Sequence, residues 1–432
     1  MAKKNGVAKK VKAAKKEAPK RKSVKKEVKE MVDQSVKEIA SASQSHDEVS
    51  PVVEVIGFGT SPTQSEAPLT LSTADTISTV SVSRESLLNG LKVARDFSGG
   101  RKNTMPILSN CLLAVKKDEI GRWFITLAAT DLEASWKATY PCEATAEISQ
   151  AVPLETFYSE LKALTEDIKD AELTFKQGAI RVNGRCDIYT MPGEDYPQIP
   201  EVEGSSVKVS LTALRAVLPA VGQNDARYVL NGALFDFDKG IVVGTDGHRL
   251  HLDNIEKQEH GRIIIPRRVA ELMSKHGGNE ITLLVKGSSF SGKLADGDMT
   301  GRLIDGNFPN YEQVIPKSAP ITVEFSAKDM MKVFEGCLPI LNEKSHAIAL
   351  LVNGKIEVQA VSSDRGVYKW HVAGNISGKG PEEIKFGFNV NYLQDAFRSY
   401  AAEEGATVTM QLSDPLSPSL INGKAVVMPM RV

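Results

Sequence analysis

The pattern of hydrophobic and polar positions changes near Val80. Before this point large apolar residues are few, whereas after it short runs alternate between apolar and polar residues, the period of half-buried strands. Helix-like segments interrupt these runs, two in each third of the remaining chain. The pattern predicts these helices within residues 83–97, 154–164, 208–222, 263–276, 322–337 and 386–402.

The same signals return at a nearly fixed spacing, which indicates an internal repeat. Asp131, Asp246 and Asp364 each close a strand-like run, and they are 115 and 118 residues apart. Two proline-bounded segments, MPGEDYPQIP and DGNFPNYEQVIP, end 116 residues apart, at Pro200 and Pro316. Proline disfavours a helix interior, so we interpret these segments as extended linkers between equivalent domains.

Each third reads as two units of strand, helix and several strands, so this unit occurs six times. A unit of this kind buries its helix against one face of a sheet, which places helices on one side and strands on the other. The sequence therefore predicts an α+β fold with three tandem domains of two half repeats each. We set their bounds at 79–202, 203–318 and 319–432. By itself this pattern also fits a generic α+β repeat protein without a defined function.

Residues 1–78 have a different composition, rich first in Lys and then in Ser, Thr and Glu, and we expect this tail to be disordered. A transient helix from Val24 to Ile39 is compatible with valines at i, i+4 spacing. Residues 1–38 carry a formal charge of +9, and residues 39–432 carry −10. A basic tail suits polyanions, whereas an acidic body can touch DNA only locally.

Composition argues for a soluble protein of several domains. At 432 residues, with 41% hydrophobic and 25% charged residues, the chain has no apolar run near the ~18 residues of a membrane span. The N-terminus lacks the apolar stretch of a secretory signal. Four widely spaced cysteines, Cys111, Cys142, Cys186 and Cys337, form no metal motif and indicate reduced thiols. We expect a cytoplasmic, nucleoid-associated protein.

Two segments raise the possibility of catalysis. GSSFSGK, residues 287–293, matches the phosphate-loop pattern, but Leu294 replaces the Ser/Thr that would bind Mg²⁺ and a turn follows instead of a helix. A hairpin is the better interpretation. His248 and His251 could suggest a catalytic or metal pair, but residues at i and i+3 of a strand point to opposite faces. Asp246-Gly247 is a turn dipeptide, so a hairpin with a polar pocket rim is the better interpretation. We expect no catalysis, no cofactor and no metal.

Motifs at the repeat positions identify a family. In chain order they are GGRKNTMPILSN, TDLE, NDARYVLNGALF, TDGHRL, IIPRRVAELM, RLIDGNFPNY, NEK, FGFNVNYL and the C-terminal MPMRV. Together they span residues 78–432 and resemble the bacterial DNA polymerase III β subunit, the sliding clamp. The resemblance implies a processivity factor. Two chains would join head to tail into a six-domain ring around duplex DNA, with helices lining the hole.

The resemblance also implies two sets of functional residues. Inner-surface positions that would face DNA are Arg101, Lys102, Tyr228, Arg267, Arg268 and Lys275. A groove between the second and third domains would bind short peptides of the polymerase, the clamp loader and repair proteins. Its matching residues are Leu230, Thr245, Gly247, His248, Arg249, Leu250, Pro309, Val314, Val426, Met428, Pro429, Met430 and Arg431, with Asn389 and Tyr392 at the rim.

The chain departs from the family pattern in three places. Gln313 stands where the family often has Arg, and Ser345 stands where an aromatic residue is common, so peptide preference can differ. The basic tail is the third departure, and the resemblance does not explain it. An alternative function follows from the tail: a DNA-compacting protein whose body only oligomerises.

Overall fold

The computed structural model describes residues 76–99, 105–341, 346–378 and 383–432. The predicted helix between Val24 and Ile39 lies outside these residues, as does all of the predicted tail except 76–78, which already belong to a strand. None of the described helices has the length and apolar content needed to cross a bilayer.

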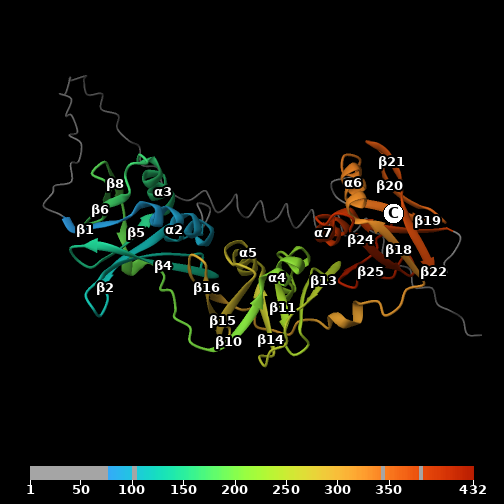
Figure 1. The fold of residues 1–432 in the computed structure, drawn as a ribbon, viewed down its shortest axis with the longest axis horizontal. Helices are drawn as coiled ribbons and strands as arrows, with labels where there is room; N and C mark the ends of the chain where they lie inside the picture. Colours follow the sequence, from blue (N-terminus) through green and yellow to red (C-terminus); the bar gives the residue numbers. More distant parts are fainter. Residues whose placement is uncertain (1–75, 100–104, 342–345, 379–382) are drawn as a thin grey trace, which may run out of the picture. The chain divides into compact units, whose positions relative to one another are not determined.

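The six predicted helices are all present in the described part of the chain (Figure 1). They are α2 (Arg84–Phe97), α3 (Leu154–Ala163), α4 (Leu211–Val217), α5 (Arg267–His276), α6 (Ala327–Cys337) and α7 (Val390–Ala401). They pack in pairs, α2 with α3, α4 with α5 and α6 with α7. The α+β prediction is therefore confirmed.

The strands fall into three successive sets, which we call the first, second and third repeat. The first repeat contains β1 (Thr76–Ser83), β2 (Asn110–Lys117), β3 (Trp123–Thr130), β4 (Ala134–Ala144), β5 (Ile148–Pro153), β6 (Asp170–Lys176), β7 (Ala179–Val182), β8 (Cys186–Tyr189) and β9 (Met191–Pro192). The second contains β10 (Ser205–Ser210), β11 (Gly232–Asp236), β12 (Ile241–Thr245), β13 (Arg249–Asn254), β14 (Arg262–Pro266), β15 (Glu280–Lys286), β16 (Ser289–Leu294) and β17 (Gly297–Arg302). The third contains β18 (Ile321–Ser326), β19 (Ala347–Val352), β20 (Ile356–Ser362), β21 (Gly366–Val372), β22 (Gly374–Gly378), β23 (Ile384–Asn389), β24 (Thr407–Leu412), β25 (Ser419–Ile421) and β26 (Ala425–Val427).

Strand pairing crosses from one repeat to the next at two places. β17 pairs antiparallel with β4, which joins the second repeat to the first. β26 pairs antiparallel with β13, which joins the third repeat to the second. Three sheets result, with strand orders β10-β15-β16-β17-β4-β1-β6-β7-β8, β14-β11-β12-β13-β26-β25-β24-β18-β22 and β21-β20-β19-β23. The strands β2, β3, β5 and β9 branch from the first of these sheets.

The first helix of each repeat begins in the same way. Ser83, Ser210 and Ser326 precede α2, α4 and α6, and each hydroxyl oxygen accepts a hydrogen bond from a backbone N–H of the first helical turn. A serine cap of this kind stabilises a helix by about 1 kcal/mol. The repeat is therefore visible in local chemistry as well as in topology.

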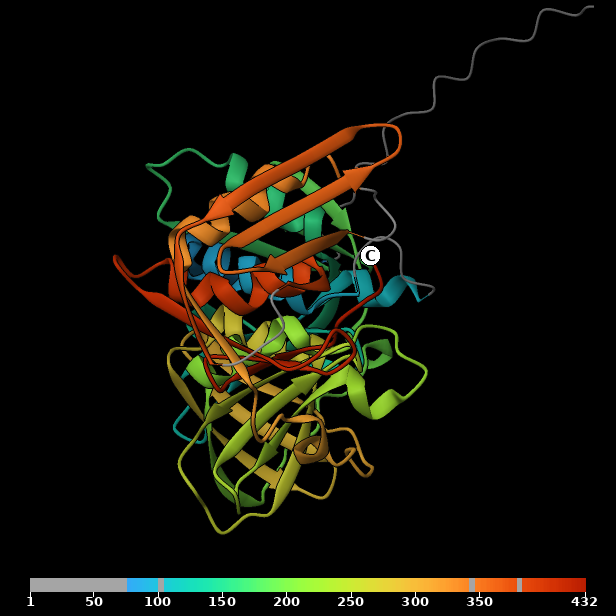
Figure 2. The same ribbon diagram turned by 90° about the vertical axis from the view of Figure 1, so that its right-hand side faces the viewer.

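Apolar faces of the helices pack on the sheets to form three cores. One fills the first and second repeats, and another fills the third. A smaller cluster includes Leu230, Leu250, Tyr311 and Val426, and so joins the second repeat, the linker and the last strand. Figure 2 shows the β20–β21 hairpin in orange, with β21 at the edge of its sheet.

Local predictions can be compared with the structure. The segment 287–293 is a hairpin between β15 and β16, closed by the pair Lys286 and Ser289, so it is not a phosphate loop. The strand-like runs before Asp131, Asp246 and Asp364 end at Thr130, Thr245 and Ser362, as predicted. All four cysteines are free thiols.

The two linkers differ from the fully extended form that we predicted. Each contains one short 3₁₀ turn, η3 (Gly193–Asp195) and η6 (Tyr311–Val314). Asn310 caps the second, since its side-chain oxygen accepts from the N–H of Glu312 at 3.2 Å. Such a turn is compatible with proline before or at its first positions.

Candidate functional site

The predicted groove residues converge where β13 meets β26. Leu250 pairs with Val426 and Arg249 with Val427. Beyond β26 the C-terminal segment continues across both repeats: the N–H of Met428 donates to the carbonyl of His248 at 3.0 Å, and the N–H of Met430 donates to Gly387 at 2.9 Å. The end of the chain therefore spans from β13 of the second repeat to β23 of the third.

One wall of the predicted groove would be the tight turn between β12 and β13. Asp246 Oδ1 accepts hydrogen bonds from the N–H groups of His248 and Arg249 at 2.9 and 3.0 Å. The Thr245 hydroxyl donates to the Arg249 carbonyl at 2.6 Å. Gly247 has φ +84°, a left-handed conformation that glycine adopts without a steric penalty. The turn predicted from Asp246-Gly247 is confirmed.

Arg249 is held by protein groups on several sides. Its Nε donates to Asp246 Oδ2 at 3.0 Å, Nη1 to Asp395 Oδ2 at 2.5 Å and Nη2 to the Pro219 carbonyl at 2.6 Å. The guanidinium carbon lies 4.5 Å from the centroid of the Tyr392 ring. The side chain is only 12% exposed. Asp395, which belongs to α7, was not among the predicted site residues.

The other wall of the predicted groove would be helix α7. Tyr392 lies one turn before Asp395 and stacks on His248, with ring centroids 6.5 Å apart. Burial raises the pKa of Tyr392 above its ordinary value. Asn389 caps the helix, because its Oδ1 accepts from the N–H of Asn391 at 3.0 Å. Asn389 and Tyr392 thus lie at the start of α7.

The remaining predicted groove residues are more exposed. Val314 and Met428 are exposed large hydrophobic residues. Pro309 and Arg431 are also exposed, whereas Pro429 and Met430 are half-buried. Gln313 is exposed in η6, and Ser345 lies outside the described residues. An apolar floor with polar groups at its edge suits an extended peptide with an apolar anchor.

His251 has a different environment from His248. It is buried in β13, and its Nδ1 is 3.2 Å from the Ala216 carbonyl, which can only accept. Burial lowers its pKa below the ordinary 6.5. The described residues contain no group of His, Cys, Asp and Glu arranged to hold a metal ion.

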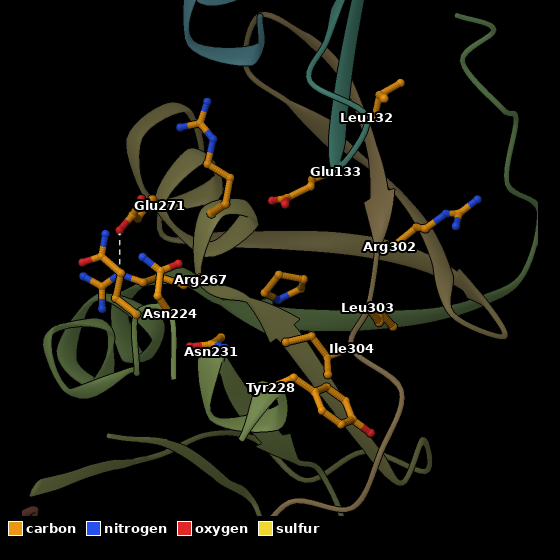
Figure 3. A pocket seen from close by; sticks show the side chains of 13 residues that line it. Leu132, Glu133, Asn224, Tyr228, Asn231, Arg267, Glu271, Arg302, Leu303 and Ile304 are labelled. Carbon is orange, nitrogen blue, oxygen red and sulfur yellow. Dashed lines mark hydrogen bonds and ion pairs between the residues drawn. The ribbon is translucent and has the colours of Figure 1, made fainter. Parts of the chain in front are cut away.

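Of the predicted DNA-facing residues that the structure describes, all but Lys275 line one pocket of about 540 Å³ (Figure 3). Tyr228, Arg267 and Arg268 line this pocket. Figure 3 shows Glu133 pointing into it, with Tyr228 and Ile304 opposite. Tyr228 is 60% exposed. Arg101 and Lys102 lie outside the described residues.

The cations of α5 already have protein partners. Arg267 donates to Glu271 at 2.9 Å and to the Val221 carbonyl at 2.5 Å. Arg268 pairs with Asp131 at 3.2 Å and donates to the Asp96 carbonyl. Lys275 pairs with the Asp96 carboxylate at 2.8 Å.

His276 meets the same carboxylate at 2.8 Å, so Asp96 of α2 collects three basic residues of α5. Sequence reasoning did not find Asp96. A lone acid at the end of a helix, 172 residues or more from its partners, gives no local signal.

The loop before Tyr228 is ordered by its own ion pair. Arg227 donates two hydrogen bonds from its side chain to Asp225, at 3.0 and 2.8 Å. These bonds lower the pKa of Asp225 to about 2. Asn231 also accepts from the Asp225 N–H at 2.8 Å. Tyr228 therefore stands on a fixed loop.

Comparison with known proteins covers all three repeats. Family models match in chain order: DNA polymerase III beta subunit, N-terminal domain over residues 78–200, central domain over 206–310 and C-terminal domain over 312–431. The beta sliding clamp of Proteus mirabilis is 30% identical over 375 residues, which cover 81% of this chain and 99% of that protein. The beta sliding clamp of Pseudomonas aeruginosa is 29% identical over 380 residues, with the same coverage.

A solved structure gives the same answer. The crystal structure of DNA polymerase III subunit beta from Pseudomonas aeruginosa superposes with a TM-score of 0.72 at 27% identity, covering 82% of this chain and 100% of that one. The chain therefore belongs to the DNA polymerase III beta subunit family, the sliding clamps, and is a processivity factor of a DNA polymerase rather than a catalyst.

Proposed function

We propose that two copies of this chain close head to tail into a ring around duplex DNA, and that a groove between the second and third repeats captures partner peptides. The clamp domains would be 79–202, 203–318 and 319–432. The observation that carries the groove is the pairing of β13 with β26, which joins two repeats along one apolar seam. A ring that encloses DNA can slide along it, because such a ring needs few direct contacts with the phosphates.

The groove would take an extended segment of the polymerase, the clamp loader or a repair protein. Leu230, Leu250 and Val426 would form its floor, and flexible Met428 and Met430 would adapt to the anchor side chain. Pro309, Val314, Pro429 and Arg431 would complete the rim, together with Thr245, Gly247, His248, Asn389 and Tyr392. The exposed Gln313 would alter which peptide residues are preferred at one end of the groove.

Duplex DNA would run through the hole of the ring, past the helices that line it. Tyr228 is the best placed of the described candidates, because its ring is largely exposed on a fixed loop. Arg267, Arg268 and Lys275 would act mainly through their field, since their donors already meet protein acceptors. Arg101 and Lys102 remain predictions from the sequence.

Ring closure requires two different edges that fit each other. Strand β21 is an unpaired edge, and it carries Trp370, 55% exposed and stacked on Tyr368. Strand β8 ends the first sheet and carries Tyr189, 71% exposed. Unpaired edges with apolar side chains tend to pair with another chain. We propose that β21 of one copy joins β8 of the other.

The first test combines solution mass by light scattering with retention on DNA after loading. A dimer that stays on nicked circles and runs off linear DNA is expected. Trp370→Glu should shift the mass to a monomer, whereas Ile120→Glu, at an exposed apolar residue away from either edge, should leave the dimer intact. A wild-type monomer, or equal retention on both DNA forms, would overturn the ring.

A second proposal concerns the tail, because the charge of +9 on residues 1–38 favours polyanions. We propose that it adds nonspecific affinity for DNA in the cytoplasm, at the nucleoid. Deleting residues 1–75, which leaves β1 complete, should weaken salt-sensitive DNA retention but leave loading and polymerase stimulation intact. Complete loss of function in the deletion would favour the DNA-compaction alternative. Unchanged salt-dependent retention would reject this role of the tail.

A further inference from the structure

Arg249 stands in the proposed groove, yet its polar contacts are within the protein. Three of its nitrogens donate to three different segments: the Asp246 turn, the end of the α4 region at Pro219, and Asp395 on α7. With 12% of the side chain exposed, little of the guanidinium is available to a ligand. Its contacts are those of a bridge between repeats.

We infer that Asp395 is a positioning residue of the groove, and that Arg249 acts on a bound peptide through its bridge to Asp395 and not by direct contact. The inference rests on the proposed peptide groove. In this view the ion pair of Arg249 with Asp395, 146 positions apart in the chain, sets the distance between the two groove walls, which are the Asp246 turn and α7.

The geometry around the pair is well suited to this role. A planar guanidinium fixes orientation when carboxylates meet its edge and an aromatic ring covers its face. Here Asp246 and Asp395 occupy the edge, and the Tyr392 ring lies 4.5 Å from the guanidinium carbon. Tyr392 and Asp395 are one helical turn apart, so α7 holds Arg249 at two points.

The bridge connects directly to the groove walls. Asp246 orders the turn that presents Gly247 and His248, and His248 both stacks on Tyr392 and accepts the Met428 N–H. Removing the Asp395 charge would leave Arg249 with one carboxylate, and α7 would be tied to the turn only through the Tyr392 ring. The two walls then lose their fixed spacing. Peptide binding would have to order them again, and this lowers the affinity.

The chain offers a matched control. Asp395 Oδ1 also pairs with Arg398 at 3.4 Å, but Arg398 is exposed and contacts no groove residue through this pair. Arg398→Ala removes one partner of Asp395 and spares the bridge. Asp395→Asn is nearly isosteric, removes the charge and preserves a polar group of the same size.

The experiment uses the full-length dimer and a fluorescein-labelled Ser-Leu-Leu-Phe peptide, with anisotropy as the readout. Asp395→Asn should weaken binding about tenfold, in the range typical of coupling between sites, while Arg398→Ala stays within about twofold. Arg249→Met should weaken binding too, and the double variant should be no worse than the more affected single one. Arg249→Lys, which can still pair with one acid, should recover part of the affinity.

Hydrogen exchange distinguishes positioning from general destabilisation. In Asp395→Asn the Met428 amide should exchange faster at unchanged Tm and unchanged dimer mass. Binding by Asp395→Asn equal to wild type, or additive losses in the double variant, would overturn the inference. If the wild-type dimer itself fails to bind the peptide, the proposed groove fails instead, and the two failures are thereby separated.

Discussion

The two places where repeats join use the same backbone plan with opposite charge arrangements. At each junction an aspartate opens a turn, the next strand pairs with the last strand of the following repeat, and an arginine ties the turn to that repeat's second helix. At the first junction the arginine is Arg268 of α5, and it meets Asp131 of the turn. At the second, the turn supplies Arg249 and α7 supplies Asp395.

Both junctions thus have an ion pair between repeats, but the arginine comes from the following repeat at the first junction and from the preceding repeat at the second. The first junction concentrates bases on Asp96, which holds Lys275 and His276 together. At the end of the last strand, Met428–Met430 occupy the place of Arg302, Leu303 and Ile304, so the second junction has Met428 where the first has Arg302. The peptide groove that we propose lies at the junction that has methionine at this position.

The largest effect is expected from removing the C-terminal segment of the second junction. Deleting Met428–Val432 should lower peptide affinity by about 100-fold or more, because Met428 and Met430 belong to the proposed groove and their N–H groups bond to both repeats. Anisotropy with the labelled peptide measures this loss. Light scattering should still give a dimer, since the segment bonds to His248 and Gly387 and is part of neither β8 nor β21; loss of the dimer would contradict its placement.

At the first junction, Asp96→Ala should lower the free energy of unfolding by about 1–2 kcal/mol. It leaves His276 and Lys275 without their acceptor, although Lys275 is well exposed and adds little. Urea unfolding followed by tryptophan fluorescence measures the change. Asp329→Ala, at an exposed ion pair, should cost at most about 0.5 kcal/mol. Equal effects would show that Asp96 does not stabilise the junction.

The turn residue after each aspartate gives a smaller contrast. Leu132 and Gly247 both have positive φ, +74° and +84°. Gly247→Leu should cost about 1–2 kcal/mol, since a side chain there is strained and meets Arg227. Leu132→Gly, at a 52% exposed residue, should gain about 0.5 kcal/mol after the entropy of glycine is subtracted. Calorimetry should give a lower Tm than wild type for Gly247→Leu and a slightly higher Tm for Leu132→Gly. A higher Tm for Gly247→Leu would contradict the prediction.

The smallest expected effect is a pH dependence confined to the second junction. His251 is buried five residues after Asp246, and the corresponding residue after Asp131 is the buried Trp136. Because burial lowers the pKa of His251, the unfolded chain binds a proton that the folded chain does not, and stability falls as pH drops below 6.5. The loss between pH 7 and 5.5 should reach up to about 1 kcal/mol. His251→Gln should flatten this part of the urea-unfolding profile, and an unchanged slope would exclude His251 as its source.

The sequence determined what depends on neighbours along the chain. Apolar spacing located all six helices in the described part, and the serine caps agree with their starts. Asp246-Gly247 identified a turn, and the recurring unit of strand, helix and several strands predicted the α+β fold. These signals are local, because helix periodicity, caps and turns require only a few consecutive residues.

Tertiary structure alone decided which charges meet. The sequence placed Arg268 and Lys275 beside DNA and Arg249 against a peptide, but each guanidinium or ammonium found a carboxylate or carbonyl of another repeat. Asp96 and Asp395, the acids that organise the two junctions, carry no mark in the sequence. A charged side chain pairs with whichever opposite charge the folded surfaces bring within a few ångströms. Partners that lie 146 to 180 positions apart in the chain become neighbours only when the strands have paired.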